Sequence, residues 1–294
     1  MTLPPPSSPT IEHYRKYAQE VCEDLPSASY PVHVYALAVR ILYAVFGKDW
    51  VDHHILDNDD KSSFFRNLEA AAGNGEFHHA RVVDLAETII NLQGTPGLED
   101  VISEMKLGHI EDRFAELEVC KILTMAGSRV NFVAPTGARG SSYDLEIETS
   151  AGKVCADVKC RIESNLEVNR DLNPNAILNT LKAARTQLPQ DQMGALFLKL
   201  PQSWAPDGDI TQLTPRLEKV AREFLRTTKR VVAIVMYFNM VLQKDGGLGV
   251  FTEYQQVLNV RHRFGTNEIP VLPQTLEPFL APRPNWVRLA NLFS

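Results

Sequence analysis

The amino-acid sequence predicts an α/β protein in which a mixed sheet flanked by helices follows an all-helical N-terminal segment. Two observations lead to this fold class. Apolar residues recur at helical spacing through residues 10–92. Residues 129–201 instead contain three short strand-like runs, an amphipathic helix and a further strand-like run. Elements in this order are typical of a sheet with both parallel and antiparallel neighbours.

The N-terminal segment holds expected helices at residues 11–25, 30–47, 62–73 and 78–93. The run at 30–47 is apolar almost all round, with only His33 and Arg40 interrupting it. Such a helix must be buried by other helices or by a second subunit. Its short length and the central Arg40 argue against a membrane span.

The residues GTPG at 94–97 are typical of a boundary between domains. We therefore expect a helical module over residues 1–100, a sheet domain over 101–265, and a proline-rich tail over 266–294 that packs on the core. The module is expected to mediate homodimerisation, to bind a partner protein or to regulate access to a site. In the alternative interpretation, these helices simply complete one monomeric core.

The sheet domain is expected to begin with a long helix at 110–127, which Gly127 ends. A strand at 129–135 and a hairpin within 142–160 come next, followed by a helix at 174–188 and a strand at 194–201. The remaining expected elements are a helix at 214–228 and strands at 230–240 and 249–260.

Composition narrows the class of protein. The chain has 294 residues, of which 44% are hydrophobic and 22% charged, as in globular domains. Its four cysteines form no CxxC pair, and the N-terminus has no apolar signal region, so we expect a cytoplasmic protein. No Walker loop, GxGxxG or GxSxG sequence is present, so nucleotide hydrolysis and serine-esterase chemistry have no support.

Charge is distributed unevenly along the chain. The formal net charge is −6, which at first argues against a nucleic-acid partner. Residues 1–110, however, carry 8 Lys and Arg against 16 Asp and Glu, while residues 111–294 carry 22 against 20. The second part of the chain is therefore free to present a basic surface to nucleic acid.

Residues 142–160, SYDLEIETSAGKVCADVKC, carry the strongest chemical signal. Side chains alternate between the faces of a strand, so Asp157 and Lys159 share one face. A turn centred between Ser150 and Ala151 places Asp144 directly opposite Asp157, and a turn centred one residue later places Asp144 opposite Lys159. Two carboxylates this close repel each other unless a cation lies between them. Mg²⁺ accepts one or two carboxylates together with waters and phosphate oxygens.

Three segments, in this order, resemble the PD-(D/E)XK nuclease superfamily, which has the restriction-endonuclease-like fold. They are Glu116 in AELEVCKILTMAG, Asp144 in YDLEIE and Asp157-Val158-Lys159 in CADVKC. The similarity to archaeal Holliday-junction resolvases is strongest here, and it covers roughly residues 108–200. Tyr143 stands where the family name has proline.

The resemblance implies a division of roles. Asp144, Asp157 and the backbone carbonyl of Val158 would bind Mg²⁺ or Mn²⁺, and Glu116 would hold a water or a second ion. Lys159 would orient and help deprotonate the attacking water, which favours a lysine with a lowered pKa. Helical periodicity does not distinguish Glu116 from Glu118, so Glu118 remains an alternative.

Weaker candidates for nucleic-acid contact are polar residues near these segments. Lys182 and Arg185 share one helix face, which suits contact with phosphates, although a solvated face is the commoner explanation. Arg261, His262 and Arg263 form a basic cluster without an assigned place. The predicted contact residues are Arg139, Arg161, Lys182, Arg185 and Gln187.

The sequence therefore predicts a metal-dependent nuclease that hydrolyses phosphodiester bonds, in DNA rather than RNA. Restriction, repair and anti-phage defence are all compatible settings. The alternative from a different class is a non-catalytic nuclease-fold module that binds nucleic acid or a protein partner.

Overall fold

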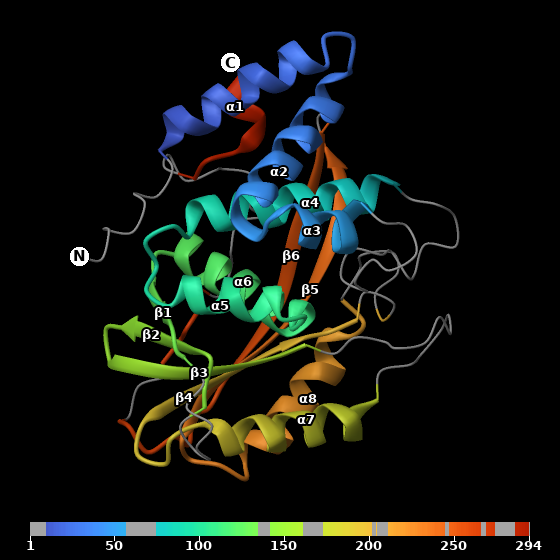
Figure 1. Ribbon diagram of the computed structural model, residues 1–294. Helices are drawn as coiled ribbons and strands as arrows, with labels where there is room; N and C mark the ends of the chain where they lie inside the picture. Colours follow the sequence, from blue (N-terminus) through green and yellow to red (C-terminus); the bar gives the residue numbers. More distant parts are fainter. Residues whose placement is uncertain are drawn as a thin grey trace, which may run out of the picture.

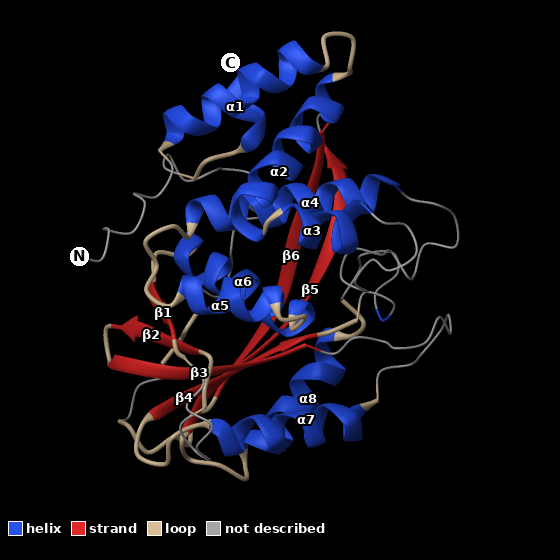
Figure 2. Ribbon diagram, viewed as in Figure 1, coloured by secondary structure: helices blue, strands red, loops and turns tan. Residues whose placement is uncertain are grey.

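The computed structural model describes residues 10–56, 75–134, 142–160, 173–201, 204, 211–244, 247–265, 269–273 and 286–293. The chain forms a mixed α/β structure with one six-stranded sheet between helices (Figures 1 and 2). The expected α/β class with a mixed, helix-flanked sheet is thus confirmed. The helix expected at residues 62–73 lies outside the described residues.

The strands lie in the sheet in the order in which they occur in the chain. An antiparallel meander comes first: β1 (Arg129–Phe132), β2 (Leu145–Thr149) and β3 (Gly152–Cys160). β4 (Met193–Lys199) and β5 (Val231–Lys244) then run parallel to β3, and β6 (Gly247–Leu258) returns antiparallel to β5. The crossovers to β4 and β5 contain α7 (Pro174–Gln187) and α8 (Thr214–Leu225).

Both faces of the central strands are buried, which explains their continuous apolar sequence. In β5, Ala233 and Val235 pack towards the N-terminal helices and α6 (Ile110–Met125). Ile234 and Met236 point to the opposite face, where they pack against α7 and α8. Figure 1 shows these two helices on one side of the sheet and the remaining helices on the other.

The N-terminal helices pack in the same apolar core as the sheet. They are α1 (Ile11–Asp24), α2 (Tyr30–Phe46), α3 (Lys48–Val51), η1 (Asp52–Leu56), α4 (Gly75–Asn91) and α5 (Leu98–Lys106). Leu42 of α2 and Leu85 of α4 are fully buried in one cluster with Phe114 of α6. The core-facing side of the run at 30–47 is therefore covered within this chain, whereas Tyr30 and Val32 at its start stay exposed.

The segment GTPG is packed against the sheet. The backbone N–H of Phe132 donates to the carbonyl of Pro96 at 2.9 Å. Gly97 has a φ of 81°, and a Cβ atom there would lie 2.5 Å from the carbonyl oxygen of Phe132. Glycine is required for both reasons, because other residues rarely adopt this φ and would collide with β1. The segment joins the two parts of the chain closely.

Residues 286–293, which end in the 3-10 helix η4 (Leu289–Phe293), are bound to α4. The side chain of Asn91 donates to the carbonyl of Val287 and accepts from its N–H, at 2.8 and 2.7 Å. Glu87 pairs with Arg288 at 2.8 Å and accepts from the N–H of Leu289 at 2.9 Å. Leu289 and Leu292 complete the apolar core, so these residues hold α4 in place.

The expected elements that fall within the described residues are present, but α3, η1, α5 and η4 were not expected, and one hairpin is longer than expected. The strand expected at 230–240 continues to Lys244, and its partner begins at Gly247, ahead of the expected residue 249. Figure 1 shows the β5–β6 hairpin extending past the shorter strands towards α4. None of the helices in the described ranges is long and apolar enough to cross a membrane.

A chain that begins at Leu98 is expected to lose its cooperative fold. Removing α4 strips Val82, Leu85 and Ile89 from the core, each 2% exposed or less and each contributing about 1.5–3 kcal/mol by burial. We expect low soluble yield and no sharp thermal transition by circular dichroism. A truncated protein that melts cooperatively near the temperature of the full chain would show that residues 98–293 fold alone.

Candidate active site

Asp144 lies where β2 separates from β3. The register pairs Leu145 with Ala156 and Thr149 with Gly152, so Ser150 and Ala151 form the turn. Of the two turns that the sequence left open, the structure has the one that sets Asp144 opposite Asp157. The N–H of Asp144 donates to the carbonyl of Ala156 at 2.9 Å. Its Oδ2 accepts from the N–H of Val158 at 2.7 Å, which continues the β2–β3 ladder through a side chain.

Asp157 is fully buried, and its polar contact is with Lys159. The Nζ of Lys159 lies 2.8 Å from Oδ2 of Asp157 and donates to the carbonyl of Val158 at 3.3 Å. Oδ1 of Asp157 accepts no hydrogen bond from any residue that the structure describes. A buried carboxylate oxygen without a donor is unfavourable, and a water, a bound ion or a catalytic role accounts for such atoms in proteins.

Glu116 reaches the same place from α6. It is 4% exposed, and its Oε1 accepts from Nη1 of Arg113 at 2.6 Å. The charge of Asp144 acts on both Glu116 and Arg113, so the helix and the β2–β3 fork meet here. The structure thus brings Glu116, Asp144, Asp157 and Lys159 together.

Burial and mutual repulsion dominate the electrostatics of this site. Burial, followed by the charge of Asp144, raises the pKa of Glu116 to about 8 and that of Asp157 to about 7. Burial also raises the pKa of Asp144, although Lys159, the N–H of Val158 and Arg113 oppose it. Carboxylates that hold protons near neutral pH indicate a site with too little positive charge for its acids.

The lowered pKa expected for Lys159 is not present in this metal-free arrangement. Burial alone would lower it, but the charges of Asp157 and Asp144 and the hydrogen bond to Asp157 raise the pKa above its ordinary value. The ammonium group balances the acids and stays protonated. Burial lowers the pKa of a lysine only where acids do not surround its amine, and here Asp157, Asp144 and Glu116 do.

Glu118 belongs to a different network in the interior. Its Oε1 accepts from Arg81 at 2.8 Å and also from Asn239, and its Oε2 accepts from Lys199 at 2.6 Å. Asn239 in turn accepts from Thr252 at 2.8 Å. Both carboxylate oxygens are therefore occupied by cations and amides, so the geometry favours Glu116 over Glu118 as the helix residue of the site.

A divalent cation fits the residues present in part. Asp144 and Asp157 face each other beside the carbonyl of Val158, and Oδ1 of Asp157 lacks a donor within the described chain. Two carboxylates with a carbonyl suit Mg²⁺, which retains several waters. No group of three or more His, Cys, Asp or Glu side chains in the described ranges is arranged to hold a metal. The ammonium of Lys159, between Asp157 and Val158, stands where a cation is expected.

Three of the five predicted nucleic-acid contacts, Lys182, Arg185 and Gln187, lie on α7. Arg139 and Arg161 lie outside the described residues. Lys182 is exposed on α7. Arg185 and Gln187 lie at the end of α7, where Arg185 donates to the carbonyl of Thr227 at 3.3 Å. This is the edge where β4 and β5 begin, whereas Lys159 is at the opposite end of β3.

Arg113 is the site residue that sequence reasoning missed. Its guanidinium is mostly buried, and its Nε has no hydrogen-bond partner within the described residues. The available signal was its place three residues before Glu116, because residues at this spacing share a helix face. In a helix that is apolar nearly all round, Arg113 is the cation that pairs with the site's glutamate.

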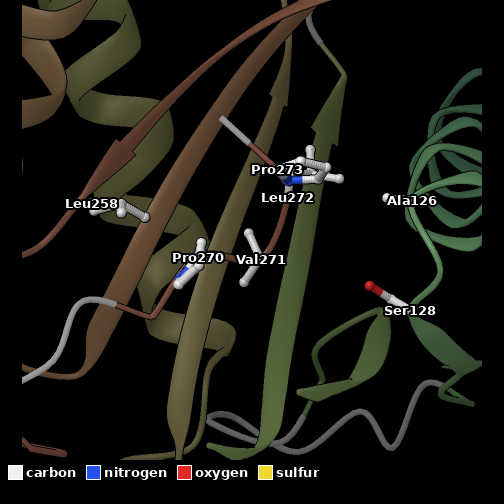
Figure 3. Close-up of a pocket in the computed structure, with 7 residues that line it drawn as sticks. All are labelled: Ala126, Ser128, Leu258, Pro270, Val271, Leu272 and Pro273. Atoms are coloured by element: carbon white, nitrogen blue, oxygen red, sulfur yellow. The ribbon is translucent and has the colours of Figure 1, made fainter. Parts of the chain in front are cut away.

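A surface pocket elsewhere offers little chemistry. It lies between the end of α6 and residues 270–273 and is lined by Ala126, Ser128, Leu258, Pro270, Val271, Leu272 and Pro273 (Figure 3). Apolar side chains dominate this lining, and none of the seven residues belongs to the carboxylate site.

Comparison of the chain with protein-family models, curated protein sequences and solved structures found no match.

Glu118→Gln is expected to destabilise the fold strongly. The substitution keeps the shape of the side chain but leaves the buried charges of Arg81 and Lys199 without their carboxylate, which typically costs about 3–5 kcal/mol. Urea unfolding at neutral pH measures the change. Glu146→Gln is the control, because its pair with the exposed Lys153 contributes about 1 kcal/mol or less. Equal losses in both variants would contradict the assigned role.

The metal-free protein is expected to lose stability as pH rises. Glu116 and Asp157 ionise at about 8 and about 7 when folded, against ordinary values of 4.5 and 3.8. Between these limits the folded state binds more protons than the unfolded state, so the free energy of unfolding falls with increasing pH. Melting temperatures measured from about pH 5 to about pH 8 should therefore decrease.

Asp157→Asn should flatten this dependence and melt above the parent protein at the alkaline end, because one of the repelling acids is gone. Asp191→Asn, at a side chain that is 98% exposed, is the matched control and should leave the slope unchanged. The electrostatic account fails if Asp157→Asn retains the parent's slope.

Proposed function

We propose that this chain is a divalent-metal-dependent nuclease of the PD-(D/E)XK type, acting on DNA in preference to RNA. The observation that carries the proposal is the meeting of Asp144, Asp157, Lys159 and Glu116 at the fork of β2 and β3. The four residues come from three separate segments, and each has the chemical type that phosphodiester hydrolysis requires. The order α6, β1–β2–β3, α7, β4 supports a restriction-endonuclease-like fold.

The acids account for binding the ion. Asp144, Asp157 and the carbonyl of Val158 would hold Mg²⁺ or Mn²⁺, which supplies a Lewis acid for the phosphoryl group and acidifies water. Asp144 is already oriented by the N–H of Val158. Asp157 offers Oδ1 directly and Oδ2 once Lys159 moves away from it.

The two remaining groups act on the water and the phosphate. Lys159 is the most suitable group for orienting the attacking water, because its side chain is 34% exposed while its amine stays beside the acids. Its positive charge would offset the charge that develops on the phosphorane. Glu116, held by Arg113, accepts a hydrogen bond from a water or binds a second ion.

The N-terminal helices are proposed to form a module for partner contact, with a second copy of the chain as the favoured partner. The core-facing side of α2 is already covered, so contact would use apolar residues exposed near the α1–α2 connection. Leu25 and Val32 are 39% and 41% exposed there. A cytoplasmic location and a role in restriction, repair or defence are part of the same proposal.

A non-catalytic module that binds nucleic acid or a protein partner is the second candidate. The observation in its favour is that the described residues form no three-ligand metal group. The presence of Glu116, both aspartates and Lys159 weighs on the side of catalysis, since a binding module has no need of three buried carboxylates that repel one another beside an ammonium group.

Purified protein is expected to cleave DNA in the presence of Mg²⁺ or Mn²⁺ and to be inactive with a chelator. Asp157→Ala and Asp144→Ala should abolish cleavage by removing ion ligands, and Lys159→Ala should lose most activity yet still bind the ion. Gel assays on duplex, junction and single-stranded DNA and on RNA measure cleavage, and calorimetry measures ion binding.

Glu146→Ala is the matched control, because it removes a carboxylate of β2 that lies two residues after Asp144 and outside the site. Cleavage by Asp157→Ala at the parent's rate would refute the site, and an intact ion-binding parent without cleavage would favour the binding module.

A further inference from the structure

Six basic residues that are far apart in the sequence lie together at one end of the sheet, where the interior strands β4 and β5 begin. The end of α7, the turn between α8 and β5, and the turn after β6 meet where β4 and β5 begin. We call this group the basic edge; it consists of Arg185, Arg226, Lys229, Arg230, Arg261 and Arg263. The group includes Arg261 and Arg263, which the sequence alone did not assign to any site.

Backbone contacts fix the segments of the basic edge to one another. The N–H of Arg263 donates to the carbonyl of Lys229 at 2.9 Å. The buried side chain of Asn259 donates to the carbonyls of Thr228 and Val231 at 3.0 and 2.7 Å, and it accepts from the N–H of Arg261 at 3.0 Å. The turns that carry the cations are therefore built on a buried amide, so their positions are set before any partner binds.

Several guanidinium groups are also held in place individually. Arg185 lies over the ring of Phe224 at 5.6 Å, and Arg263 lies over the ring of Phe264 at 5.1 Å. Arg230 donates to the carbonyl of Arg185, and Arg263 donates to the carbonyl of Gln190. A guanidinium has five N–H donors, so donors remain for a further acceptor.

The like charges are close enough to act on one another. Burial lowers the pKa of Arg230, and the charges of Arg185 and Arg263 lower it further. The one acid paired with the group is Asp191, whose carboxylate is 3.8 Å from Arg263 and 98% exposed, among the residues that the structure describes. Packed cations with so little compensation favour an anionic partner.

We propose that the basic edge binds the phosphate backbone of a nucleic-acid duplex as a second contact, separate from the carboxylate site. This inference rests on the proposed nuclease function. Arginine predominates over lysine in the group, and its planar fork matches phosphate oxygens. Residues 1–110 carry 8 Lys and Arg against 16 Asp and Glu, so we expect the basic edge to determine on which side of the chain the duplex lies.

The separation of the two sites suits a single duplex. Cys155 of β3 pairs with Gly194, whose N–H donates to the carbonyl of Arg230. Lys159 lies four residues further along β3, which is about 13 Å of strand. Phosphates repeat about every 3.4 Å along each DNA strand, so about four of them span the distance from the carboxylates to this level of the sheet. The basic edge would contact the duplex several nucleotides from the scissile bond.

Binding without cleavage separates this inference from the proposed function. The full chain carrying Asp157→Asn is titrated with a labelled DNA duplex in a chelator, from about 50 to about 200 mM salt, by fluorescence anisotropy. The test variant adds Arg226→Gln, Lys229→Gln and Arg261→Gln, which are all exposed positions. The matched control adds Arg15→Gln, Lys16→Gln and Lys106→Gln, three exposed cations of the acidic half, for the same change in net charge.

The test variant is expected to bind the duplex at least about tenfold more weakly than the control at low salt. The slope of log affinity against log salt should fall by about 2–3, since each lost phosphate contact removes about 0.9. Equal affinity and equal slope in the two variants would overturn the inference, as would a parent that binds no duplex. Each single substitution serves in place of the triple variant if the latter melts early.

Cleavage by the otherwise unmodified chain is measured separately with Mg²⁺. If the parent cleaves DNA while the test and control variants bind the duplex equally, the role of the basic edge is refuted and the nuclease proposal stands. A parent that binds through the basic edge but never cleaves would remove the nuclease proposal alone. If the test variant binds an acidic polypeptide more weakly than the control but binds the duplex equally well, the basic edge serves a protein partner and the inference is overturned.

Discussion

The carboxylate of Glu118 is the point on which the arrangement of the chain depends. It binds Arg81 of α4, Lys199 at the end of β4 and Asn239 of β5, so one side chain of α6 joins the N-terminal helices to the centre of the sheet. Arg81, Glu118 and Asn239 are buried, the side chain of Lys199 is 12% exposed, and burial lowers the pKa of Lys199. A buried charge network tolerates few alternative geometries, which makes it a device for specifying one packing of α4 on α6.

The fixed position of α6 has a direct effect on the candidate site. Glu116 and Glu118 are two residues apart, so a helix held through Glu118 must turn Glu116 in another direction, towards Asp144. Arg113, one turn earlier, follows Glu116 to the same place. The interior thus separates two glutamates that look equivalent along the sequence: one completes the fold, and the other is left among acids that repel it.

Periodicity and local spacing explain why much of this arrangement was readable from sequence. The alternation in 142–160 limited Asp144 to two partners on the same face, and the β-prone run at 230–240 indicated a strand, which is β5. Contacts between residues far apart in the chain could not be predicted from the sequence. Neither the neutralisation of Glu118 by Arg81 and Lys199 nor the packing of Gly97 on Phe132 leaves a local pattern, because the partners are 35 or more residues apart.

The attachment of residues 287–289 to α4 has a consequence for how the protein forms. Glu87 and Asn91 bind residues that follow them by 196 to 202 positions, and Leu289 closes the core beside them. During synthesis, residues 287–289 must leave the ribosome before Glu87 and Asn91 find these partners. Pairings this distant slow folding, because loop closure precedes any gain from contact. The core beside α4 therefore stays incompletely packed until residues 287–289 have been synthesised, and in this period chaperones have access to the apolar helices.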